Sequence, residues 1–178
     1  MTYGTEVKES PGRWLKLSGP SGIGKSTICR EIVFANNKIQ KINTDTELQI
    51  LKKYSSEIET IKSLMLGFDS ILVDSRMNAN RFFKNDCVDG KLFTTISKVE
   101  KFEYSLSQGE VQRFIMLEAI SSQCELIVMD ECLSGLPEIF ELEILIFIKE
   151  NFPKLNILYI SHRINDAISR LFEDEIRL

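Results

Sequence analysis

Residues 14–27 read WLKLSGPSGIGKST, an apolar run that passes into a glycine-rich loop and then into a helix start. WLKLS (14–18) has the composition of a short buried strand, and STICREIVFA (26–35) has helical spacing. The segment GPSGIGKS (19–26) matches the pattern G-x-x-x-x-G-K-[ST], and it lies between a strand and a helix, as this pattern requires. The stretch therefore predicts a loop that binds the phosphates of a nucleotide.

The residue types in this loop suit phosphate chemistry. Glycines let the backbone turn tightly, so that successive N–H groups can face phosphate oxygens. Lys25 supplies a positive charge to the β- and γ-phosphates, and the Ser26 hydroxyl can coordinate Mg²⁺. The positive end of the following helix points at the same anion. The predicted nucleotide-binding residues are Gly19, Pro20, Ser21, Gly22, Ile23, Gly24, Lys25, Ser26 and Thr27.

Further apolar segments continue an alternation of strands and helices. ELIVMDE (125–131) has the form of a central parallel strand closed by acids, and NILYIS (156–161) predicts a second buried strand. A helix is expected between them, from Pro137 through residues 138–150, and a final helix over INDAISRLF (164–172). This order predicts an α/β fold, a P-loop NTPase with a central, mainly parallel sheet flanked by helices.

Size and charge limit the class of protein. The chain has 178 residues, which suits one domain with a substantial core. Charged residues make up 27% of the chain and the net charge is -4, as expected for a soluble, slightly acidic protein. Because the chain lacks an overall basic field, we do not expect it to bind nucleic acid.

Neither a membrane span nor a metal-binding cysteine pattern is expected. No apolar run approaches the roughly 20 residues that cross a bilayer, and ILIFI (144–148) predicts a buried helix face. The N-terminus has no signal or transit character, which favours a cytoplasmic protein. The four cysteines lack metal-ligand spacing and are expected to be reduced thiols: Cys29, Cys87, Cys124 and Cys132.

Polar residues follow two of the predicted strands. Asp130 can hold Mg²⁺ through water, and the adjacent Glu131 can then polarise an attacking water. The strand 156–161 is followed by His162. Because the ends of parallel strands converge on one rim, we expect His162 to share that rim with Lys25 and Glu131 and to sense a γ-phosphate. The alternatives are that the acids merely cap a strand and that the lone histidine is structural.

Residues 106–113, LSQGEVQR, carry a second helix start. Ser107 and Glu110 have the spacing of a capping box, which would leave amides near Gln108 and Gly109 available to a ligand. The order GPSGIGKST, LSQGEVQR, LIVMDE and SHR resembles the ATP-binding cassette (ABC) ATPases, in particular their exporter-type branch. LSQGEVQR resembles the signature segment of that family.

The resemblance implies a function and partners. In the ABC family two domains form a head-to-tail homodimer or heterodimer that buries two ATP molecules. The family pattern implies ATP and Mg²⁺ as cofactors, Ser26 and Asp130 as metal ligands, and catalytic roles for Lys25, Glu131 and His162. It also implies a separate transmembrane permease subunit, which would hold the chain at the inner face of the membrane. The signature residues that would contact the partner's ATP are Ser107, Gln108, Gly109 and Glu110.

The resemblance covers most of the chain, so residues 1–178 are expected to form a single ABC-type ATP-binding domain with a reduced helical subdomain at approximately 68–120. FDSILVDSRMNAN (68–80) resembles the family's Gln-loop segment and puts Phe68, which cannot coordinate Mg²⁺, at the glutamine position. We expect the permease to dock near residues 68–90. The candidate docking residues are Ile71, Leu72, Phe82 and Phe83. The alternative is that these four residues belong to the core.

Departures from the family pattern keep other functions open. Tyr3 is the only aromatic residue near the N-terminus that could stack on adenine, Gln108 replaces the usual glycine, and Pro137 replaces an aspartate that helps the two subunits communicate. Phe68, Pro137 and the lack of an adenine-stacking strand favour an alternative, an ATP-binding switch or immunity protein of ABC type with weak hydrolysis, whereas the intact Lys25, Glu131 and His162 oppose it. A small P-loop kinase is a further alternative, although a kinase needs an arginine-rich lid and has no use for residues 106–113.

Overall fold

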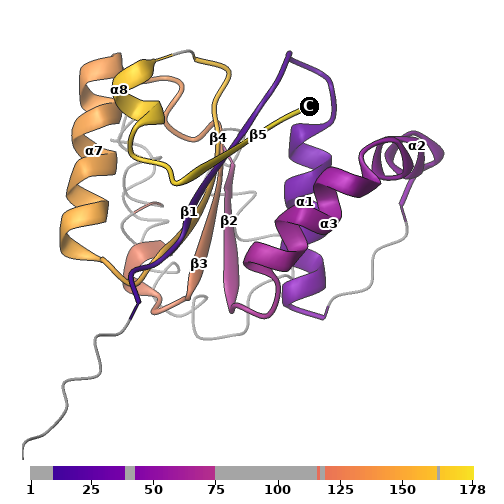
Figure 1. The fold of residues 1–178 in the computed structure, drawn as a ribbon, viewed down its shortest axis with the longest axis horizontal. Coiled ribbons are helices and arrows are strands. Elements are labelled where there is room, and N and C mark those ends of the chain that lie inside the picture. The colour runs from indigo at the N-terminus through magenta and orange to yellow at the C-terminus, as the bar shows by residue number, and fades with distance from the viewer. Residues whose placement is uncertain (1–9, 39–42, 75–115, 117–118, 164) are drawn as a thin grey trace, which may run out of the picture.

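A computed structural model of the protein describes residues 10–38, 43–74, 116, 119–163 and 165–178. Within these residues five strands form one sheet, in which every neighbouring pair is parallel. Their order across the sheet is β2-β3-β4-β1-β5 (Figure 1). The strands are β1 (Trp14–Ser18), β2 (Ser70–Asp74), β3 (Leu126–Asp130), β4 (Asn156–Ile160) and β5 (Asp174–Arg177). The predicted α/β architecture with a parallel sheet is confirmed.

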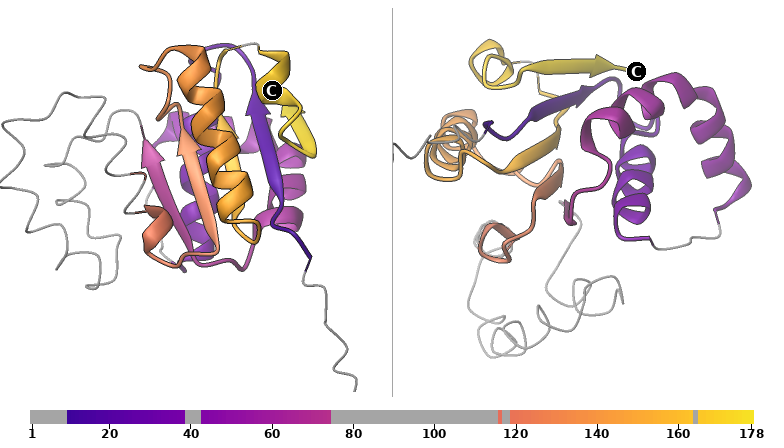
Figure 2. Two further views of the ribbon diagram at one scale, coloured as in Figure 1. Left: turned by 90° about the vertical axis from the view of Figure 1, so that its left-hand side faces the viewer. Right: turned by 60° about the horizontal axis from the view of Figure 1, so that its bottom comes forward.

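Helices cover both faces of this sheet. Figure 2 shows α7 crossing one face, while α1 and α3 lie behind the other. The sequence pattern did not place the boundaries of α2, which begins at a capping box: the Glu47 amide donates to Thr44 Oγ1 at 3.3 Å, and the Thr44 amide donates to Glu47 Oε2 at 3.1 Å. The described helices are α1 (Lys25–Asn36), α2 (Asp45–Lys53), α3 (Ser55–Met65), α7 (Glu138–Asn151) and α8 (Asp166–Ser169).

The core consists of two layers, one on each face of the sheet. Successive strand residues point to opposite faces, so the apolar runs of β1, β3 and β4 supply both layers. On β4, for example, Ile157 and Tyr159 join the layer under α7, whereas Leu158 and Ile160 join the layer under α1 and α3. All four side chains are at most 1% exposed. A strand buried on both faces needs apolar residues at every position, which explains why these runs were recognisable in the sequence.

The helix predicted over 164–172 is wrong beyond its first part. The structure forms only the four-residue α8 and then turns into β5, which pairs with β1. Phe172 turns inward instead of continuing the helix. Its ring stacks on Tyr159 at 5.3 Å between centroids and packs against Trp14 at 5.6 Å. The ring packs against the core where a longer helix would continue, and the chain then leads to the edge of the sheet.

The prediction that ILIFI (144–148) forms a buried face is only half right. Leu145 and Ile148 are fully buried, but Ile146 is 36% exposed and Phe147 is 51% exposed. The segment is apolar on every side, whereas α7 rests on the sheet along one side only. The sequence therefore could not show which residues face the core.

The residues at the start of the expected Gln-loop segment lie elsewhere in the fold than predicted. Residues 70–74 form β2, a strand of the sheet, so the helical subdomain does not begin at 68. Ile71 is buried in the layer under α7, so it is a core residue, and Leu72 is partly buried against the opposite layer. Phe68 precedes β2 and packs against that same opposite layer. Phe82 and Phe83 lie outside the described residues.

Candidate functional site

The glycine-rich loop connects β1 to α1 through backbone that favours glycine. Gly22 has φ 78° and Gly24 has φ 113°, both in the left-handed region. A Cβ atom added to Gly24 would also lie 2.4 Å from Cγ2 of Ile50 on α2. Both the backbone conformation and the close contact therefore require glycine at position 24.

The first turn of α1 provides the features of an anion site. Gly24 precedes the helix with no side-chain capping bond, and the first turn carries no acidic residue. The first bond of the helix runs from the Ile28 amide to the Gly24 carbonyl at 3.1 Å. The amides of Lys25, Ser26 and Thr27 precede this bond, so they have no intrahelical acceptor. Their N–H groups and the helix dipole favour a phosphate at the loop.

Lys25 ties the loop together. Its side chain is buried, and Nζ donates to the Gly19 carbonyl at 2.7 Å and to the Pro20 carbonyl at 2.8 Å. A buried ammonium group needs such acceptors. Phosphate oxygens could replace these carbonyls as acceptors, so the same amine both shapes the loop and supplies its positive charge.

Two acidic residues lie at the carboxyl end of strand β3. Asp130 ends the strand and is 3% exposed. Glu131 has φ 53°, a left-handed conformation that costs a residue with a side chain about 1–3 kcal/mol. Its amide donates to the Ile160 carbonyl at 3.1 Å, which helps to hold this conformation. Such backbone strain next to a strand end is common at functional sites.

The acidic pair and the histidine meet at the rim of the sheet. Nδ1 of His162 lies 3.3 Å from Oε1 of Glu131. In the strand order, β4 lies between β1 and β3 (Figure 1), so the segment that follows β4 and carries His162 comes between the phosphate loop after β1 and the acids at the end of β3. The parallel direction of all three strands brings their carboxyl ends to the same rim, where ligands bind in open α/β sheets.

Asp74 is a further acidic residue at this rim that the sequence analysis missed. It ends β2 and is the register partner of Asp130 on β3. Phe68, which the resemblance placed at the Gln-loop position, precedes β2 and so lies toward the amino end of this strand. The signal was present in the sequence, since SILVD is an apolar run closed by an acid, as LIVMD is. A carboxylate at this place can hold a divalent cation.

The carboxylates also affect a neighbouring thiol on α1. Burial raises the pKa of the Cys29 thiol well above its ordinary range, and the negative charge of Asp130 raises this pKa further. Asp74 acts in the same direction. Cys29 is therefore protonated and unreactive at neutral pH, and this coupling to the rim arises from contacts that no local sequence pattern indicates.

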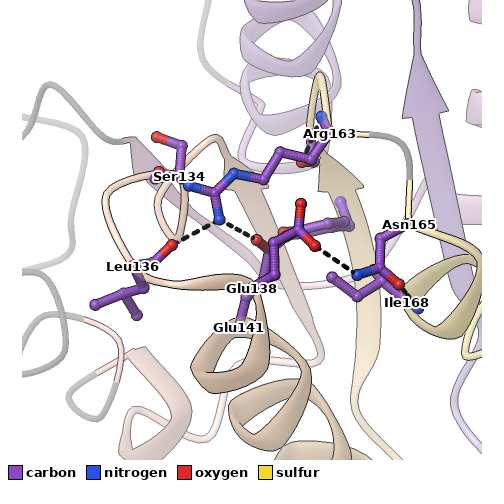
Figure 3. Close-up of polar contacts among 9 residues, drawn as sticks. Ser134, Leu136, Glu138, Glu141, Arg163, Asn165 and Ile168 are labelled. Carbon is purple, nitrogen blue, oxygen red and sulfur yellow. Dashed lines mark hydrogen bonds and ion pairs between the residues drawn. The ribbon is translucent and has the colours of Figure 1, made fainter.

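Arg163 follows His162 in the motif SHR, but the sequence analysis gave this residue no role. Its guanidinium group donates to backbone carbonyls of the loop that runs from Glu131 to Pro137, and to the buried carboxylate of Glu141 on α7 (Figure 3). Pro137 begins α7, and its carbonyl accepts from the amides of Phe140 and Glu141. Arg163 thereby connects the segment that carries His162 to the loop that begins with Glu131.

The remaining predicted site residues divide into two groups. Gly19, Pro20, Ser21 and Ile23 lie in the loop, and Ser26 and Thr27 in the first turn of α1. The signature residues Ser107, Gln108, Gly109 and Glu110 lie outside the described residues.

A comparison with protein-family models identifies the family. The model described as "ABC transporter" matches residues 4–134, well over half of the chain. This chain belongs to the ABC transporter family. The resemblance drawn from its motifs is confirmed, and the parallel sheet is the P-loop core of an ABC ATP-binding domain.

Curated relatives of this ABC domain include both export and import proteins. The chain is 28% identical to the microcin-J25 export ATP-binding/permease protein McjD of Escherichia coli, a match that covers 86% of this chain and 29% of McjD. It is 25% identical to the phosphate import ATP-binding protein PstB of Prochlorococcus marinus, covering 84% of this chain and 64% of PstB. The chain thus spans less than two thirds of either relative.

Solved structures support the fold of this ABC domain. A metal-chelate type ABC transporter in an inward-facing conformation gives a TM-score of 0.57 at 16% identity, with 94% of this chain and 69% of that chain covered. A bacterial Atm1-family ABC exporter with ATP bound gives 0.50 at 17% identity, covering 86% and 30%. Among the described helices, none has the length and apolar character to cross a membrane.

Proposed function

We propose that this ABC domain hydrolyses MgATP in a head-to-tail dimer and so drives a separate membrane-spanning partner. The observation that carries the proposal is the pairing of Glu131 with His162, at 3.3 Å, on the rim that also holds the phosphate loop. Residues 1–178 would act as one ATP-binding domain at the inner face of the membrane. The relatives serve both import and export, so they do not favour a direction of transport.

The loop residues fit a nucleoside triphosphate with its cation. The left-handed glycines, the uncapped amides of α1 and the Lys25 ammonium group are donors and charges that suit phosphate oxygens. The Ser26 hydroxyl and the Asp130 carboxylate are oxygen ligands of the kind that Mg²⁺ prefers, and these two residues would hold the ion. When bound, Mg²⁺ neutralises charge that develops on the phosphates.

Hydrolysis would depend on Glu131 and His162. The Glu131 carboxylate would take a proton from the attacking water, and its 30% exposed side chain can reach solvent. Nδ1 of His162 faces this carboxylate, so Nε2 is the ring atom that can interact with the γ-phosphate. The signature residues 107–110 would complete the site in the partner subunit, as they do in the family.

The proposal predicts the behaviour of a Glu131→Gln variant. Without the general base, turnover should fall by about 10²–10⁴-fold, while ATP binding should remain. Steady-state ATP hydrolysis, nucleotide affinity and size-exclusion chromatography with ATP would be measured together, and the variant should accumulate as an ATP-bound dimer. Glu138→Gln, which alters an exposed acid on α7, is the matched control. Wild-type hydrolysis in Glu131→Gln would contradict the role of Glu131.

A second candidate function is an ATP-binding switch with weak hydrolysis. Pro137 favours it, because this residue begins α7 and has no carboxylate with which to contact a partner subunit. The support that Phe68 gave to this candidate is lost, since Phe68 does not end β2. Turnover of the wild-type dimer at saturating MgATP separates the two candidates. Membership of the ABC family argues against the small P-loop kinase.

A further inference from the structure

We propose that Arg163 is a positioning residue that locks the loop 131–137 to α7 through the buried Glu141, and thereby sets the geometry of Glu131 and His162 for hydrolysis. This inference rests on the proposed ATPase function. Arg163 belongs to the motif SHR (161–163), but neither it nor Glu141 has been given a role in the proposed hydrolysis.

The guanidinium group of Arg163 joins three places in the fold. Nη1 donates to the Leu136 carbonyl at 2.6 Å and to Oε2 of Glu141 at 2.9 Å, and Nη2 donates to the Ser134 carbonyl (Figure 3). Two of these acceptors are backbone atoms of the loop, and the third is a side chain of the following helix. The planar group therefore fixes the loop relative to α7.

Glu141 provides a fixed anchor for this arrangement. Its side chain is fully buried, and its two oxygens have separate donors: Oε1 accepts from the Tyr159 hydroxyl and Oε2 from Arg163. Burial raises the pKa of Tyr159, and the bond to Glu141 raises it further, so the hydroxyl remains a donor. A buried carboxylate needs both a countercharge and hydrogen bonds. Glu141 therefore meets both needs through Arg163 and Tyr159, although the core layer around it is otherwise apolar.

The chain connects this anchor directly to the proposed catalytic pair. Arg163 is adjacent to His162, and its amide donates to Oγ of the buried Ser161 at 3.1 Å. At the other end, the Ser134 amide donates to the Glu131 carbonyl at 3.1 Å. One side chain therefore links the two segments that carry the histidine and the acid. A shift of about 1 Å in such a pair can cost roughly 10²-fold in rate.

The geometry requires arginine and not merely a positive charge. Arginine presents several N–H groups in a rigid plane, whereas lysine has one flexible ammonium group. An Arg163→Lys variant can keep its ion pair with Glu141, but it cannot hold both loop carbonyls in the same way. The variant therefore tests the loop geometry without leaving the buried carboxylate unpaired.

The test compares Arg163→Lys with wild type and with Arg170→Lys, which alters an exposed arginine at the end of α8. We expect kcat for ATP hydrolysis to fall 10- to 100-fold in Arg163→Lys, with nucleotide affinity changed less than about twofold. Arg170→Lys should match wild type. Retained kcat in Arg163→Lys, or a parallel loss of kcat and nucleotide affinity, would overturn the inference.

Hydrogen exchange gives a readout that does not require turnover. The amides of Ser134 and Leu136 are hydrogen-bonded within the loop, to the carbonyls of Glu131 and Leu133. In Arg163→Lys we expect faster exchange in peptides covering 131–137 and unchanged exchange in β3 and β4. Unchanged loop exchange, or faster exchange throughout the chain, would refute the positioning role. A further outcome is that the wild-type protein does not hydrolyse ATP while Arg163→Lys still speeds exchange in loop 131–137. In that case the proposed ATPase function fails, and the role of Arg163 in holding the loop is retained.

Glu141→Gln completes a double-mutant cycle. Glutamine keeps the shape but removes the charge that orients the guanidinium group. If Arg163 acts through Glu141, the double variant should lose no more kcat than the more damaged single variant. Additive losses would show that the two residues act independently and would overturn the inference.

Discussion

At the scale of single residues, the phosphate loop depends on Gly24 for two separable reasons. Its φ of 113° disfavours any side chain, and a Cβ would lie 2.4 Å from Ile50. Gly67 provides a natural comparison, because it has φ 96° but no atom within 4 Å of an added Cβ. Both glycines therefore have a backbone conformation that would strain a residue with a side chain, but only at Gly24 would a Cβ also meet a neighbouring atom.

We predict that Gly24→Ala lowers the free energy of unfolding by more than Gly67→Ala. The backbone strain should cost each variant about 1–3 kcal/mol, and only Gly24→Ala adds the clash with Ile50. Urea unfolding curves give both values, and nucleotide titration should show weaker binding in Gly24→Ala alone. Equal destabilisation would mean that the contact with Ile50 relaxes without cost.

At the scale of elements, α7 shows how an apolar sequence is divided by its packing. Leu145 is fully buried, whereas Phe147, two residues later, is 51% exposed. Both are large apolar residues in the middle of one helix, so intrinsic helix preference differs little between them. What differs is the contact with the sheet.

We predict that Leu145→Ala destabilises the protein by about 2–5 kcal/mol, because it leaves a cavity under α7. Phe147→Ala should change the free energy of unfolding by roughly 0.5 kcal/mol or less. Chemical denaturation of both variants checks the prediction. A large loss in Phe147→Ala would show that its ring is buried in solution, for example by another subunit.

The end of the chain shows a limit of local sequence patterns. DEIR (174–177) carries three charged residues and has no apolar run, yet it forms β5. Backbone pairing with β1 supports it, and a carboxylate oxygen of Glu173 accepts from the Trp14 amide at 2.6 Å. Partners about 160 residues away in sequence decide this strand, so local composition could not predict it.

At the scale of the whole molecule, buried cysteine thiols make the free energy of unfolding depend on pH. Burial raises the pKa of Cys29 and of Cys132 in the folded protein. In the unfolded chain these thiols titrate near their ordinary pKa of about 8.5. The unfolded state therefore loses protons first as the pH rises, which favours unfolding.

We predict that the free energy of unfolding is constant with respect to these thiols below about pH 8 and falls as the pH rises above about 8.5. A Cys29→Ala, Cys132→Ala double variant should show a shallower fall. Urea unfolding in reducing buffer between pH 7 and 10 measures the slope. An identical slope in the double variant would contradict the contribution of the thiols.

By itself, the sequence determined the family, the phosphate loop and the acid and histidine that follow β3 and β4. These features are local: spacing within the loop, continuous apolar runs and the residue that ends each run. Only the assembled sheet placed Phe68 and Arg163, and it brought Asp74, whose strand-end position the run SILVD already indicated, beside Asp130. Which end of β2 reaches the rim depends on its parallel register with β3, and the role of Arg163 depends on a carboxylate 22 residues away. Contacts between distant segments carry no local pattern, so only the assembled sheet could place these side chains.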